Sequence, residues 1–148
     1  LDGLTALTNL EELSLGELKL GAAIDLSGLT NLKRIYLYNG GQLEELTVHD
    51  PSLITDLNLS SQNITEIDLS AYTSLQSLSL SNNPIAEIDV SAQQSLLFLD
   101  LQNTNISNLN FMLYECTCHI FICYFSALLK LYLHGYFVHF HFDTFVLT

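Results

Sequence analysis

A short phrase of apolar residues recurs five times between Leu10 and Phe111. Its clearest copy is Leu75-Gln-Ser-Leu78-Ser-Leu80-Ser-Asn-Asn83-Pro-Ile85. The successive copies begin 22, 22, 21 and 21 residues apart, at Leu10, Leu32, Ile54, Leu75 and Leu96. Because self-similarity at a fixed period marks stacked repeat units, each too small to bury its own apolar side, the phrase predicts a solenoid of about five coils.

Each copy places apolar residues at relative positions 1, 4, 6 and 11. That spacing is neither helical nor a long alternation, and it predicts a short strand that runs into a tight turn. The second half of the unit also repeats, since Ile67-Asp68-Leu69-Ser70 matches Ile88-Asp89-Val90-Ser91. We therefore expect two short parallel strands in every coil, one on each side of a flattened solenoid.

This framework resembles the leucine-rich repeat family, and within it the short 21-residue bacterial type with a nested half-period. The resemblance covers residues 4–111. It implies a leucine-rich repeat solenoid, in the α/β horseshoe class by convention, with mostly short parallel strands and turns and little helix. The family also carries asparagine at position 9, where its amide pairs with backbone groups of the turn. Only Asn83 matches, which predicts looser turns in the first two coils.

The end of the repeat divides the chain into two segments of different composition. Residues 1–111 form the predicted solenoid, which we expect to be a fragment of a longer array. Residues 112–148 hold all three cysteines, four of the five histidines and ten of the fifteen aromatic residues. Three interpretations of this atypical hydrophobic tail compete: a frame-shifted or read-through translation, a genuine carboxy-terminal cap, or a membrane-associating segment.

The tail also raises the question of metal binding. It contains Cys116, Cys118 and His119 close together, and the pair His139 and His141 further on. Structural zinc sites use C-x(2–4)-C and H-x(3–5)-H spacing, which neither group has. The sequence therefore predicts no metal site here.

The charge of the chain excludes some classes of partner. Its formal net charge is −12, and three basic residues stand against fourteen acidic ones before Met112. Nucleic-acid binding draws its affinity from lysine and arginine at phosphates, so a nucleic-acid partner is not expected. The repeat region also has no apolar stretch near the roughly 20 residues that a membrane span needs.

One coil differs from the others on its outward side. Positions 3, 5 and 7 are predicted to point outward, which puts Arg34, Tyr36 and Tyr38 on one strand face beside Lys33. Phe98 is a second exposed aromatic residue at position 3 of the fifth coil. Arginine and tyrosine dominate interface hot spots, so these five residues are the candidate partner-binding site. The alternative is that tyrosine suits a half-exposed strand and that Arg34 pairs with Glu12 or Asp56.

The opposite side carries an acidic column that includes Asp25, Asp68 and Asp89. Carboxylates opposite one another on adjacent strands repel, and calcium would relieve that repulsion. We nevertheless favour solvated carboxylates, since the column is expected to be exposed. No cofactor is predicted.

The repeat region contains no constellation typical of an enzyme. Its single histidine, His49, takes a place held by serine in other coils, which indicates a surface residue. The sequence therefore predicts a non-enzymatic protein-protein recognition module, and the alternative is a structural spacer that carries another domain. The short bacterial-type repeat implies by resemblance a secreted or cell-surface protein, and an intracellular one remains open.

Overall fold

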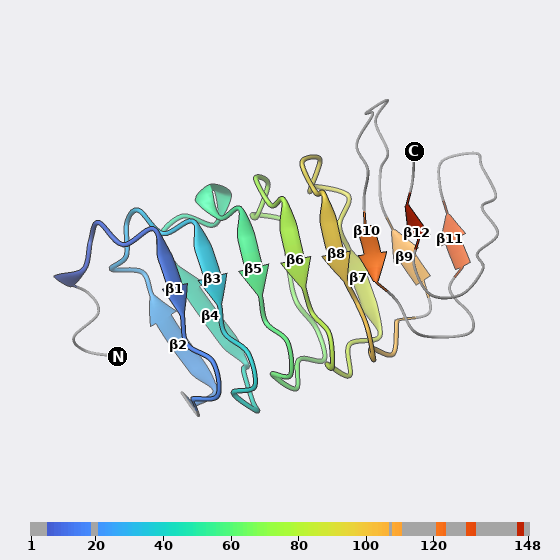
Figure 1. Cartoon of the computed structure of the whole chain (residues 1–148), viewed down its shortest axis with the longest axis horizontal. Helices are drawn as coiled ribbons and strands as arrows, with labels where there is room; N and C mark the ends of the chain where they lie inside the picture. Colours follow the sequence, from blue (N-terminus) through green and yellow to red (C-terminus); the bar gives the residue numbers. More distant parts are fainter. Residues whose placement is uncertain are drawn as a thin grey trace.

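The computed structural model describes residues 6–18 and 21–106 in full. Beyond them it describes the backbone of four strands, β9 (Asn108–Asn110), β10 (Phe121–Cys123), β11 (Lys130–Tyr132) and β12 (Phe145–Val146). The coils stack along the long axis of the molecule, in chain order from blue to yellow in Figure 1. Each coil contributes a strand to one side and returns along the other, which gives the solenoid two faces.

The first face is formed by one strand from every coil. These strands are β1 (Glu12–Ser14), β3 (Arg34–Tyr36), β5 (Asp56–Asn58), β6 (Ser77–Ser79) and β8 (Phe98–Asp100). They pair in parallel, and the paired residues are 22, 22, 21 and 21 positions apart in sequence. The predicted intervals are therefore confirmed, with four complete turns between five strands. The sheet continues through β10, parallel to β8, and β12, antiparallel to β10.

The second face is less continuous than the repeat predicts. Strands β2 (Ala23–Leu26) and β4 (Glu45–Val48) pair with each other, and β7 (Glu87–Asp89) pairs with β9, which pairs with β11. The third coil has no strand at residues 67–69, where the sequence predicts one. The prediction of two strands in every coil is wrong for this coil, and the second face is split there into two sheets.

The core is a column of aliphatic side chains between the two faces. Positions 4 and 6 point inward as predicted and are buried in every coil except at Leu15, which is partly buried. Burying one such side chain stabilises the fold by about 1.5–3 kcal/mol, so the repeated leucines account for the stacking. The described part has little helix, apart from short 3-10 turns such as η2 (Pro51–Leu53). This is the predicted solenoid, with the inward and outward columns in the expected places.

The turn after each first-face strand has a common backbone conformation. Position 8 has a positive φ in all five coils, between 54° and 60°, at Glu17, Asn39, Ser61, Asn82 and Asn103. Asparagine tolerates this left-handed region better than most residues, and it fills three of the five positions. The first two coils, which are one residue longer, add Gly21 and Gly41 with φ near 91° and 92°. Positive φ in these turns is not confined to the longer coils, since Asn63 of the 21-residue third coil has a φ of 57°.

Most of residues 112–148 lie outside the described part of the chain. The described strands β10 and β11 extend the two faces in parallel with β8 and β9. The boundary after Phe111 and the three interpretations of the tail stay predictions, and the side chains of its cysteines and histidines are not described. Among the described residues no helix is long and apolar enough to cross a membrane.

Candidate functional site

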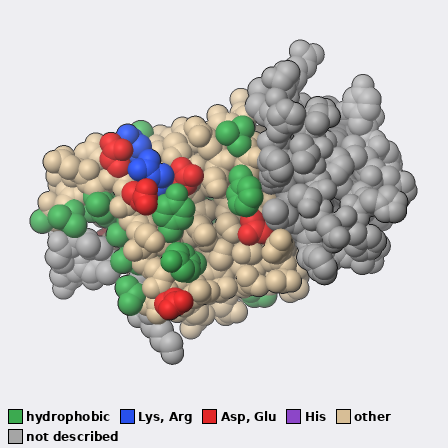
Figure 2. All heavy atoms as spheres, in the orientation of Figure 1, with side chains coloured by type: hydrophobic (Ala, Val, Ile, Leu, Met, Phe, Trp, Pro, Cys, Tyr) green, Lys and Arg blue, Asp and Glu red, His purple; other side chains and the backbone are tan. Residues whose placement is uncertain are grey.

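The five candidate residues lie on or beside the first face, as predicted. The strand register places position 3 of the five coils in one column, in the order Glu12, Arg34, Asp56, Ser77 and Phe98. Neighbouring coils are spaced by about 4.8 Å, so Phe98 lies roughly 14 Å from the second coil along the stack. Figure 2 shows this face with green apolar side chains on both sides of a tan strip. The candidate residues therefore form two clusters rather than one.

The two cationic side chains of the site form ion pairs with glutamates of the first coil. The Nε of Arg34 lies 2.7 Å from Glu12 Oε2, and the Nζ of Lys33 lies 3.1 Å from Glu11 Oε1. Glu12 raises the pKa of Arg34 above its ordinary value, chiefly by accepting that hydrogen bond. Of the two pairings considered for Arg34, the one with Glu12 is formed. Figure 2 shows the blue side chains enclosed by red acidic ones, so this end of the face carries no excess positive charge.

Tyr38 is an exposed aromatic side chain that packs on a glycine. It is 36% exposed. A Cβ built on Gly16 would lie 2.3 Å from its Cζ and 2.4 Å from its Cε2. The absence of a side chain at Gly16 thus makes room for the ring on the first coil. Gly16, at position 7 of the first coil, is therefore part of the site, although the sequence gives no sign of this role.

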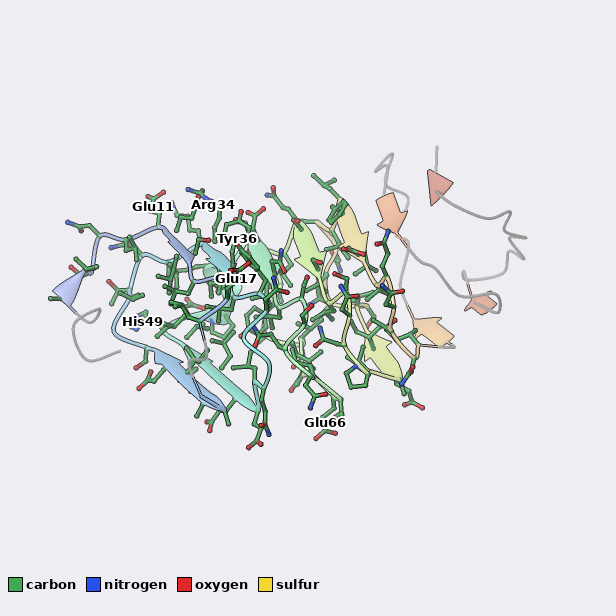
Figure 3. All side chains as sticks on the ribbon, turned by 60° about the horizontal axis from the view of Figure 1, so that its bottom comes forward. Glu11, Glu17, Arg34, Tyr36, His49 and Glu66 are labelled. Carbon is green, nitrogen blue, oxygen red and sulfur yellow. The ribbon has the colours of Figure 1, made fainter. Side chains whose placement is uncertain are left out.

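Tyr36 is the half-buried member of the site. Its strand β3 has intermediate burial at Arg34 and Tyr36 and full burial at Ile35 between them. Burial raises the pKa of the Tyr36 hydroxyl, and the nearby Asp56 carboxylate raises it further. The phenol is therefore neutral across the physiological range and acts as a hydrogen-bond donor and acceptor at the surface. Figure 3 shows Arg34 and Tyr36 on the same side of the solenoid.

A strip of short polar side chains separates the tyrosines from Phe98. The Ser60 hydroxyl lies 2.9 Å from that of Ser79 and 3.0 Å from that of Ser81, and Ser79 donates to Asp100 Oδ2 at 3.0 Å. Positions 5 and 7 of the fourth coil, Ser79 and Ser81, were predicted to point outward. Ser79 and Ser81 are nevertheless only 8% exposed, because each short hydroxyl is enclosed by its hydrogen-bonded neighbours. The strip thus consists of short serine side chains, and larger aromatic side chains lie on either side of it.

Phe98 forms the other edge of this strip. It is 37% exposed, and its neighbour Leu97 is 46% exposed. The preceding residue in its column, Ser77, is small, so the ring has no large neighbour on that side. Asp100 lies on the same strand, and together with Glu11, Glu12 and Asp56 it makes the face acidic on balance.

The acidic column on the second face has a structural role. The Oδ1 atoms of Asp25, Asp68 and Asp89 each accept a hydrogen bond from the backbone N–H of the serine two residues later, at 2.8–2.9 Å. These bonds lower the pKa of Asp68, and bonds from the hydroxyl and N–H of Ser27 lower that of Asp25. The repeated Asp-x-Ser is thus a turn motif. Among the described residues no three His, Cys, Asp or Glu side chains converge on a metal position.

His49 is exposed on the second face, as predicted. Its Nδ1 lies 3.2 Å from the carbonyl oxygen of Ser27, so the ring nitrogen is the donor. The position is held by serine in the first, third and fourth coils. No acidic or nucleophilic side chain within the described ranges is hydrogen-bonded to the ring. The geometry is that of a surface residue that links two coils.

Comparisons with known proteins find a likeness among solved structures. No protein-family model matches the sequence, and a search of curated proteins finds no match. Among solved structures the chain is similar to the functional domain of InlJ from Listeria monocytogenes, which includes a cysteine ladder. The likeness has a TM-score of 0.45 and 20% sequence identity, and it covers 74% of this chain and 36% of that one. The chain thus spans little more than a third of that structure.

Proposed function

We propose that this chain is a non-enzymatic recognition module that binds a partner protein across the first face. The observation that carries the proposal is the pair of exposed aromatic side chains, Tyr38 and Phe98, on one sheet face. Rigid aromatic side chains offer a large contact area at low cost in side-chain entropy. The expected anchors are Tyr36, Tyr38 and Phe98, with Lys33 and Arg34 at the edge of the contact.

The negative charge of this face restricts the class of partner that we propose. Lys33 and Arg34 are already paired with acidic residues, and Asp56 and Asp100 add further negative charge. Electrostatic complementarity steers association and excludes partners of like charge. The proposed ligand is therefore a protein surface with apolar groups flanked by lysine or arginine. A secreted or cell-surface location belongs to the same proposal and rests on the resemblance of the repeat.

The alternative function is a spacer that holds another domain at a distance. What favours it is the hydroxyl network of Ser60, Ser79 and Ser81, which ties the third and fourth coils together without presenting large side chains. A spacer needs regular stacking and no anchor residues. The two functions differ in one consequence, since only the recognition module loses an interaction when the tyrosines are removed.

The test is a selection followed by a substitution. Peptides displayed on phage are selected against the immobilised full chain and then titrated against the purified protein and two variants. Tyr36→Ala with Tyr38→Ala is expected to weaken the selected peptides roughly tenfold or more, since such anchors carry most of the binding energy. The control Thr47→Ala, on the second face, is expected to bind as the unmodified chain does. Equal binding by all three proteins would reject the recognition site.

A further inference from the structure

The second face is open between the second and third coils. Residues 66–69 occupy the place of a strand, yet they pair with neither β4 nor β7. No hydrogen bond joins the backbone of Glu66 or Ile67 to either neighbouring coil. Backbone groups without a protein partner require another one, whether water or a ligand. The edge of β4 that faces the third coil is unpaired as well, because β4 pairs only with β2.

The inward residues beside this opening are less buried than their equivalents elsewhere. Leu46 and Val48 of β4 and Ile67 of the third coil are only partly buried. The equivalent residues of other coils are buried, with exposed fractions of 2–6%, at Ile24, Leu26, Ile88 and Val90. The opening therefore exposes apolar side chains that the fold otherwise covers.

The opening leads into a cavity of about 490 Å³. Its apolar lining includes Leu46, Ile67 and the buried ring of Tyr72. Tyr72 takes the place of Pro51 in the preceding coil, and it is 8% exposed. Burial raises the pKa of the Tyr72 hydroxyl, with a further contribution from Asp68. The volume is within the usual range for ligand pockets.

The charged residues that line the cavity are all acidic. They are Glu44, Glu45, Glu66 and Asp68. The lysine and arginine side chains in the described ranges, Lys33 and Arg34, are paired with the first coil. Figure 3 shows Glu66 on the opposite side of the solenoid from Arg34 and Tyr36. The rim thus lacks a described cation to neutralise it.

We propose that this cavity is a docking site for an extended peptide segment of a partner protein in which lysine or arginine alternates with aliphatic residues. Successive side chains of a strand point in opposite directions, so the aliphatic ones enter the cavity while the basic ones reach the carboxylates. The peptide backbone pairs with the open edges, as in recognition by strand addition. A second copy of this chain does not fit, because its net charge of −12 repels the acidic rim. The site is separate from the first face.

A synthetic peptide tests the proposal. The probe is fluorescein-labelled Lys-Val-Lys-Val-Lys-Val-Lys, titrated against the full chain at low ionic strength by fluorescence anisotropy. Saturable binding is expected, together with slower amide exchange over residues 44–48 and 65–69. The same peptide N-methylated on alternate amides is expected to lose binding. An N-methylated peptide that binds equally well, or a probe that does not saturate, contradicts docking by strand addition.

A matched pair of charge reversals locates the probe. Glu66 and Glu87 hold the same position in consecutive coils, but only Glu66 lines the cavity. Glu66→Lys is expected to raise the Kd of the probe about fivefold, and Glu87→Lys to leave it nearly unchanged. Equal losses in both variants would mean general attraction to an acidic protein and overturn the site. Tyr36→Ala with Tyr38→Ala is expected to bind the probe normally, and a loss there would place the peptide on the first face instead.

Discussion

The side chain of Asn83 reaches the preceding coil, where its Oδ1 accepts a hydrogen bond from the backbone N–H of Gln62 at 3.0 Å. The same oxygen accepts from Ile64 N–H at 3.0 Å, and the amide nitrogen donates to the carbonyl oxygens of Leu59 and Leu80 at 2.9 and 2.8 Å. Asn83 is 1% exposed, so these bonds form out of contact with water. One amide thus holds two consecutive turns together, which confirms the role expected of this position.

Removing that amide is predicted to destabilise the solenoid. Asn83→Ala leaves several buried backbone groups without partners, which costs about 3 kcal/mol in the free energy of unfolding. The matched control is Asn105→Ala, since the exposed Asn105 side chain donates one long hydrogen bond of 3.4 Å to the carbonyl oxygen of Pro84. Urea unfolding followed by circular dichroism measures both. Equal stability of the two variants would show that the buried amide does not hold the turns.

A second prediction concerns Gly16 and Tyr38. Gly16→Ala introduces a Cβ where the Tyr38 ring lies, so the ring must move away. The substitution is expected to cost about 1 kcal/mol in the unmodified chain and much less when Tyr38 is already alanine. A double-mutant cycle in urea measures this coupling. Additive effects would mean that the ring does not rest on Gly16.

A third prediction concerns stability in acid. The N–H and hydroxyl of Ser70 lower the pKa of Asp68 below its ordinary value of 3.8, and Ser27 does the same for Asp25. A carboxyl group whose pKa is lower in the folded chain than in the unfolded chain stabilises the fold at pH above its unfolded-state pKa. This stabilisation is lost as the pH falls through the folded-state pKa. Asn keeps the Oδ1 acceptor and does not titrate.

The variant Asp25→Asn with Asp68→Asn is therefore expected to lose less stability on acidification. The measurement is the Tm of both proteins from about pH 5 to about pH 2. The fall in Tm is expected to be shallower in the double variant, while at neutral pH the turns remain intact. A parallel fall in both proteins would mean that these carboxylates do not contribute through the turns.

The leucine spacing was enough to predict the inward columns and the register. The two inward columns share the same intervals of 22, 22, 21 and 21 residues, so the position of one coil predicts that of the next. The outward position of Arg34, Tyr36, Tyr38 and Phe98 followed from the same alternation. These features depend on local pattern and period, which the sequence contains directly.

Features that depend on contacts between coils were not predictable in this way. Residues 67–69 have the same pattern as Ile88-Asp89-Val90, yet they form no strand beside the buried ring of Tyr72. The burial of Ser79 depends on Ser60 and Asp100, which are 19 and 21 residues away. The positive φ of position 8 had a signal, since three of its five residues are asparagine.

The most direct test of the account is whether one partner uses both ends of the first face. A peptide or protein selected against the full chain is titrated by calorimetry against Tyr38→Ala, Phe98→Ala and the control Leu53→Ala, whose residue is exposed but lies outside the first-face columns. Each aromatic variant is predicted to bind roughly tenfold or more weakly, and the control to bind normally. Unchanged affinity in both aromatic variants would contradict recognition by this face.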